Sequence, residues 1–199
     1  MDSLLVLLGL AVVVFASTNL DDLFILLGFF ADPKFRARHV VIGQYAGIAV
    51  LYGISVVASV LAWTIPKEHV GLLGLVPIVI GAKKLWELTR VPHNNEQALQ
   101  RSFAPRATAQ FLSVAAVTAA NGGDNIGIYT PVFAVRSGVE IVTIGVVFAV
   151  MTAVWCLLAW WMVRHSLLGR ELKRYGHRAI PFVLIGLGLL ILYEAGSFG

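Results

Sequence analysis

Charged residues are scarce in this sequence of 199 residues: aspartate, glutamate, lysine and arginine together make up 13% of it. A soluble domain carries about a quarter charged residues, so an ordinary soluble protein is excluded. Hydrophobic residues instead make up 58%, and the mean hydropathy is +0.83. Long apolar runs suit membrane helices rather than the short alternating strands of a barrel. The sequence therefore predicts an all-α integral membrane protein whose partner is the lipid bilayer.

Cysteine is almost absent, because Cys156 is the only one. A single cysteine excludes an intramolecular disulfide, a CxxC redox pair and a zinc site built from cysteines. We expect Cys156 to pack as a small hydrophobe, with soft-metal ligation as the alternative. Histidine is confined to loops and the ends of apolar runs, so a histidine site in the membrane is not expected; a loop role in metal capture is the alternative. These histidines are His39, His69, His93, His165 and His177.

Six apolar windows predict six transmembrane helices. The windows cover residues 3–31, 40–65, 70–88, 109–135, 139–163 and 179–197. The first window lacks the basic start of a secretion signal, so we expect it to be retained as a helix. Residues 89–108 are polar and predict a linker. The chain then divides into a first three-helix unit at 1–88 and a second at 109–199.

Basic residues are distributed unequally between the two sides of these windows. Thirteen fall on one side: Lys34, Arg36, Arg38, Lys83, Lys84, Arg90, Arg101, Arg106, Arg164, Arg170, Lys173, Arg174 and Arg178. Only Lys67 and Arg136 fall on the other. The positive-inside rule makes the first side cytoplasmic, with the 89–108 linker inside and both termini outside a bacterial cytoplasmic membrane. The pI near 9.5 then reflects topology rather than nucleic-acid binding.

The two halves of the sequence resemble one another at a shift of 102 residues. The matches are Asn19 with Asn121, Asp22 with Asp124, Ile42-Gly43 with Ile144-Gly145 and, at a slightly larger shift, Pro77 with Pro181. Three helices per half mean that the second half enters the membrane from the opposite side. Inverted repeats of this kind commonly bind their substrate near the midplane, on broken helices where the repeats meet.

Two polar strings, Thr18–Asp22 and Asn121–Asn125, lie inside the first and fourth windows. A charged side chain at bilayer depth costs on the order of a few kcal/mol, so it rarely persists without a task. In each string an asparagine and an aspartate three residues apart share a helix face. The Gly122-Gly123 pair favours local unwinding of window 4. Because inverted repeats bind their substrate on broken helices, we expect windows 1 and 4 both to be interrupted at the strings. At the shift of 102 residues Asp21 corresponds to Gly123, so the two strings differ by one carboxylate and we expect an asymmetric site.

Carboxylate, carboxamide and hydroxyl oxygens are ligands for divalent cations, so the strings predict a cation pathway. Carboxylates that lie close together do not all ionise readily, so a bound cation would expel protons. Metal–proton exchange follows as a hypothesis. Two structural alternatives stay open: the asparagines could bond between helices, and the aspartates could pair with Lys83 or Lys84.

The strings Asn121–Tyr129 and Thr18–Asp22, with Ile42–Tyr45 between them, resemble the cadmium resistance transporter family of the lysine-exporter superfamily. The resemblance covers essentially the whole chain and implies efflux of cadmium or a related divalent cation, with no enzymatic activity and no cofactor. An oxygen-rich site would suit Mn²⁺ or Zn²⁺ as well as the softer Cd²⁺. The resemblance implies as best metal ligands Asp22, Asn121, Asp124 and Asn125, supported by Thr18, Asn19 and Asp21.

Two other functions compete with metal efflux. An amino-acid exporter of the same superfamily would need positive charge or a helix N-terminus for the substrate carboxylate, and clustered aspartates oppose that. An intramembrane aspartyl protease also uses two membrane aspartates, but Asn-Gly-Gly precedes Asp124 where those enzymes have Gly-x-Gly. Glycine pairs at 71/74 and 186/188 would allow close helix contact within a subunit or in a homo-oligomer.

Overall fold

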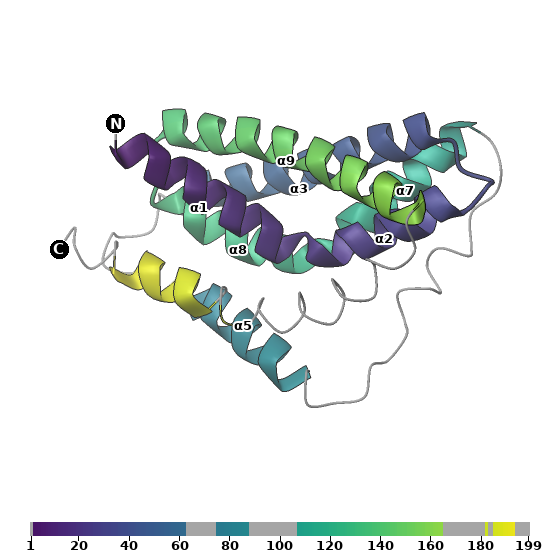
Figure 1. Ribbon diagram of the computed structural model, residues 1–199. Coiled ribbons are helices and arrows are strands. Elements are labelled where there is room, and N and C mark those ends of the chain that lie inside the picture. The colour runs from purple at the N-terminus through teal and green to yellow at the C-terminus, as the bar shows by residue number, and fades with distance from the viewer. Residues whose placement is uncertain (1, 63–74, 88–106, 165–181, 183–184, 194–199) are drawn as a thin grey trace.

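The computed structural model describes residues 2–62, 75–87, 107–164, 182 and 185–193 (Figure 1). Most of the 89–108 linker, the Gly71/Gly74 pair and parts of the third and sixth predicted windows lie outside them. All the secondary structure in the described part is helical, which confirms the all-α prediction. The helices are α1 (Asp2–Thr18), α2 (Leu20–Ala31), α3 (Ala37–Ala62), α5 (Leu75–Glu87), α7 (Ala107–Asn121), α8 (Gly123–Ala134), α9 (Gly138–Arg164) and a further stretch at 185–193.

Two of these helices, α3 and α9, are long and apolar enough to cross a membrane by themselves. They have 26 and 27 residues, which at 1.5 Å per residue is about 40 Å, more than the hydrocarbon core of about 30 Å. Residues Leu4–Ala31 form a third candidate span only if α1 and α2 count as one bent helix. The described residues thus contain two or three candidate spans, where the sequence predicted six over the whole chain.

Both windows that carry a polar string are interrupted at the string, as the sequence predicts. The axes of α1 and α2 differ by 59°, and the break between them is the single residue Asn19. The second break is Gly122, which separates α7 from α8. The backbone dihedrals at the two residues are alike, with φ −108° and ψ 16° at Asn19 and φ −83° and ψ 22° at Gly122.

Each long helix packs against the broken helix pair of the other half. Helix α3 lies on α7 and α8, whereas α9 lies on α1 and α2. Figure 1 shows α9 running along α1, with α8 on the other side of α1. The aromatic rings of Phe15, Tyr129 and Phe148 meet in the core between these helices, with centroids 5.3 Å apart for Phe15–Phe148 and 4.8 Å for Tyr129–Phe148. This packing brings the two breaks to the same interior.

Two glycines let α3 and α7 approach each other closely. A Cβ at Gly43 would lie 2.6 Å from both the carbonyl oxygen of Phe111 and Cβ of Val114. A Cβ at Gly47 would lie 2.6 Å from Cβ of Thr118. Small residues four apart are a common device for close contact between membrane helices. Any larger residue at these positions would push α3 away from α7.

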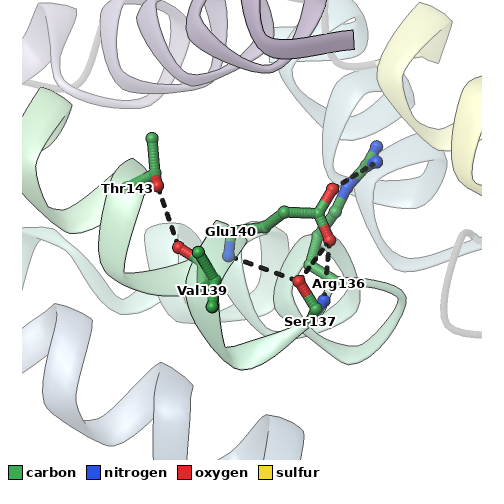
Figure 2. A network of polar contacts seen from close by, with 5 residues as sticks. All are labelled: Arg136, Ser137, Val139, Glu140 and Thr143. Carbon is green, nitrogen blue, oxygen red and sulfur yellow. Dashed lines mark hydrogen bonds and ion pairs between the residues drawn. The ribbon is translucent and has the colours of Figure 1, made fainter.

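The turn from α8 into α9 is fixed by a capping box (Figure 2). The backbone N–H and the hydroxyl of Ser137 both donate to Oε2 of Glu140, at 2.8 and 2.7 Å. The backbone N–H of Glu140 donates in return to the Ser137 hydroxyl at 3.4 Å. Arg136 adds an ion pair with Glu140 at 3.7 Å. Reciprocal bonding of this kind satisfies the first N–H groups of a helix, so α9 has a defined start close behind α8.

Candidate metal centre

Asn19, the residue at the first break, is completely buried and connects three helices. Its Nδ2 lies 2.9 Å from the carbonyl oxygen of Phe15 and 2.7 Å from the hydroxyl of Tyr129 on α8. Its backbone carbonyl accepts the indole N–H of Trp155, on α9, at 2.7 Å. Side chains of the second half therefore satisfy polar groups at the break in the first half.

Thr18 and Asn125 complete the polar contacts of Asn19. The hydroxyls of Thr18 and Tyr129 lie 2.9 Å apart, and Thr18 Oγ1 also lies 2.8 Å from Nδ2 of Asn19. Asn125 Nδ2, from α8, donates to Asn19 Oδ1 at 3.2 Å. The structure thus joins Thr18 and Asn19 of the first string directly to Asn125 of the second.

Asp22 is the aspartate that the structure buries, with 2% of its surface exposed. Its Oδ1 accepts Nδ2 of Asn121 at 3.0 Å, and its Oδ2 accepts Nε2 of Gln44 at 3.3 Å. Among the side chains that the structure describes, the hydrogen-bond partners of Asp22 are therefore the two amides of Asn121 and Gln44. An ionised carboxylate has about four lone-pair positions, so each oxygen keeps capacity for a cation after accepting one N–H.

Asn125 presents an oxygen that has no hydrogen-bond partner within the described part of the chain. The side chain is 1% exposed, its Nδ2 is used by Asn19, and its Oδ1 is buried and unpaired. A buried acceptor without a partner costs about 1–3 kcal/mol. An amide oxygen in this condition, on the residue that follows Asp124, is suited to coordinate a cation.

Asp21 and Asp124 lie beside this network, half-buried. Both carboxylates are near enough to act electrostatically on Asp22. Across the ranges that the structure describes, no three His, Cys, Asp or Glu side chains gather as a metal-binding group. Amide and hydroxyl oxygens of the network, with Asp22 as the buried charge, could hold a cation.

Cys156 lies in the hydrophobic core at 5% exposure, as expected for a small hydrophobe. It packs among apolar side chains of the same cluster as Phe15 and Phe148. A soft-metal site would need further thiolate or imidazole ligands. The arrangement of the described residues favours the oxygen-rich network.

Sequence reasoning missed four residues of the network. They are Gln44, Thr118, Tyr129 and Trp155. Gln44 could have been identified from the sequence, because a carboxamide inside an apolar window is costly to bury, as the asparagines are. The partners of Tyr129 and Trp155 depend on the register between helices, which the sequence of one chain does not specify.

Comparison with known proteins gives one match and two negative results. No curated protein and no solved structure matches the chain. A model of the family described as cadmium resistance transporter matches residues 15–199, which is nearly the whole chain and includes both polar strings. This confirms the resemblance seen in the sequence, and it agrees with a transporter rather than an enzyme. The chain belongs to the cadmium resistance transporter family.

Proposed function

We propose that the chain exports a divalent cation, cadmium or a related ion, and binds it where the two helix breaks meet. The observation that carries the proposal is the burial of the Asp22 carboxylate between amides of α3 and α7. A buried charge needs compensation, and in a membrane protein it commonly marks an ion pathway. Family membership supports transport of cadmium; the direction and the site are our proposal.

The ligand set that the geometry supports is centred on the network. Asp22 would supply charge, and the unpaired Oδ1 of Asn125 would supply a neutral oxygen. The remaining predicted ligands would complete or modulate the shell: Asn19, Asn121, Thr18, Asp21 and Asp124. Such oxygens bind harder cations than thiolates do, so Mn²⁺ and Zn²⁺ are expected substrates beside Cd²⁺.

We propose an inverted repeat as the frame for alternating access. Three features support it: both polar windows break at corresponding places, each long helix packs on the broken helices of the other half, and basic residues favour one side. Rocking of one repeat against the other would expose the site to each side in turn. The excess of basic residues on one side supports an orientation of this frame with both termini outside.

We also propose that protons move inward as the cation moves outward. Carboxylates crowded in low dielectric do not all ionise readily, so at least one of Asp21, Asp22 and Asp124 would hold a proton until a cation binds. A cation requires the ionised carboxylate, so its binding competes with the proton. A gradient that is acid outside would then drive efflux.

Proteoliposomes that contain a metal-sensitive dye test transport and coupling together. We expect the purified protein to carry Cd²⁺ down its gradient, an opposed proton gradient to accelerate the flux, and added metal to move protons the other way. Asp22→Asn should abolish the flux and Ser55→Ala should not, because within the described residues the buried Ser55 hydroxyl bonds to the Leu51 carbonyl of its own helix alone. Flux that ignores the pH gradient would contradict proton exchange; no flux of any divalent cation would contradict export.

A further inference from the structure

Gln44 joins the two halves at the buried carboxylate. It lies on α3, is 1% exposed, and donates Nε2 to Oδ2 of Asp22. At its other end, Oε1 accepts the hydroxyl of Thr118, from α7, at 2.7 Å. Thr118 is completely buried. The carboxamide therefore bridges a hydroxyl of the second half and a carboxylate of the first.

The hydroxyl of Thr118 determines which way the carboxamide of Gln44 points. A hydroxyl that donates to Oε1 holds the oxygen on the α7 side, and Nε2 then faces Asp22. If the amide turned over, its oxygen would face a carboxylate oxygen and an N–H···O bond would become a repulsive contact. Without the hydroxyl, Oε1 would also be buried without a donor, which destabilises the observed orientation.

The close contact of α3 with α7 makes this arrangement feasible. Gly47 follows Gln44 by three residues, and any Cβ there would collide with Thr118. Gly43 precedes Gln44 and permits the same approach at Val114. The short path from Thr118 through Gln44 to Asp22 depends on these two glycines.

The second half has no equivalent of this bridge. Under the shift of 102 residues, Val146 stands at the place of Gln44 and Ala16 at the place of Thr118. Neither side chain can donate or accept a hydrogen bond. The bridge therefore acts on one aspartate of the repeat pair, Asp22, which is the fully buried one.

We infer that Gln44 is a positioning residue for the Asp22 carboxylate and that Thr118 fixes the direction of its amide. This rests on the proposed function in so far as the oriented carboxylate is a cation ligand. With both oxygens tied to N–H donors, the free lone pairs of Asp22 have a fixed direction before a cation arrives. Hydrogen bonds to ligating groups typically change metal affinity or activity by about 10–100-fold when they are removed.

The first arm of the test is transport. Thr118→Val keeps the shape and removes the hydroxyl, and Thr118→Ser keeps a hydroxyl there. Thr152→Val makes the same change at a buried hydroxyl whose one partner in the described part of the chain is the Phe148 carbonyl of its own helix. Thr118→Val should raise the Cd²⁺ concentration for half-maximal flux by about tenfold or more. Thr118→Ser and Thr152→Val should stay near the wild-type value. Equal effects of the two valine variants, or none from Thr118→Val, would overturn the inference.

The second arm needs neither transport nor metal. Infrared spectra of purified protein with carbon-13 at the aspartate carboxylates contain a band of Asp22, identified by its loss in Asp22→Asn. Thr118→Val should shift that band in metal-free protein, while Thr118→Ser and Thr152→Val leave it in place. An unshifted band overturns the positioning role even if the protein transports Cd²⁺. A shifted band in a protein that moves no divalent cation supports the positioning role and contradicts the export function.

Discussion

The two helix breaks have nearly the same backbone but opposite side-chain surroundings. At each, the break residue donates its N–H to the carbonyl four residues earlier at 2.9 Å. Asn19 is then held by side chains from α8 and α9, including the indole of Trp155 at its carbonyl. Gly122 has no side chain, and it is packed directly under Leu51, where a Cβ would overlap. One break is stabilised by added polar contacts and the other by the absence of a side chain.

This difference teaches that a repeated backbone does not make a repeated site. At the first break Asp22 is buried and accepts hydrogen bonds from the amides of Gln44 and Asn121. At the second break Asp124 follows two glycines and is half-buried. Gly123 has open space at its Cβ position. We therefore expect the first break to be the rigid side of the cation site and the second to be the side that deforms.

The largest expected effects come from the aspartates of the two strings. Asp22→Asn and Asp124→Asn should each nearly abolish transport, by more than the roughly 10–100-fold loss typical of supporting groups, because each removes a charge from the ligand set. Asp21→Asn should be milder or change the preference among cations. Flux in proteoliposomes, with expression and folding checked by size-exclusion chromatography, measures this.

The aspartate series has an outcome that would contradict the metal site. Removing one partner of a buried pair destabilises a protein strongly. If Asp22→Asn and Asp124→Asn abolish folding rather than flux, the aspartates have a structural role. If Asp124→Asn retains full transport, the site belongs to the first break alone.

Alanine at the two neighbouring glycines sharpens the comparison within the second break. Gly122→Ala should lower the free energy of unfolding by about 1–3 kcal/mol, because its Cβ forces Leu51 to move. Gly123→Ala should be neutral or stabilise by up to about 1 kcal/mol, since nothing lies within 4 Å. Thermal unfolding in detergent measures both. Equal melting temperatures for the two variants would contradict the packing described for Gly122.

The smallest expected effect is at the first break. Trp155→Phe keeps an aromatic ring beside Phe15 but removes the indole N–H from the carbonyl of Asn19. That carbonyl retains the N–H of Leu23 at 3.2 Å, so the loss should be about 1 kcal/mol. The exposed Trp160 provides the control as Trp160→Phe, which keeps an aromatic ring under the Arg164 guanidinium. Identical melting temperatures for the two variants would contradict a stabilising role for the indole.

The sequence predicted the breaks from the Gly122-Gly123 pair and from the likeness of the two halves, and it predicted the site because polar residues inside apolar windows have few physical explanations. Asn19, Asp22, Asn121 and Asn125 were identified by that argument, and hydrogen bonds link them as Asp22–Asn121 and Asn19–Asn125. The bridge through Gln44 was not predicted, because it depends on how α3 lies against α7.

The sequence predicted an asymmetric site because Asp21 corresponds to Gly123, and the structure adds a second difference between the two strings. Asn121 does correspond to Asn19 in sequence, yet Asn19 is the break residue itself whereas Asn121 is the last residue of α7. A displacement of one residue turns a side chain by about 100° on a helix. It therefore gives the two asparagines different partners, Tyr129 for Asn19 and Asp22 for Asn121.

X-ray absorption at the cadmium edge of the purified, Cd²⁺-loaded protein tests the central claim most directly. The account predicts a first shell of oxygen ligands, retained in Cys156→Ser and lost, together with stoichiometric binding, in Asp22→Asn. Ser55→Ala should give the wild-type spectrum. A sulfur ligand in the first shell, or an unchanged spectrum and stoichiometry in Asp22→Asn, would contradict a cation site at the helix breaks.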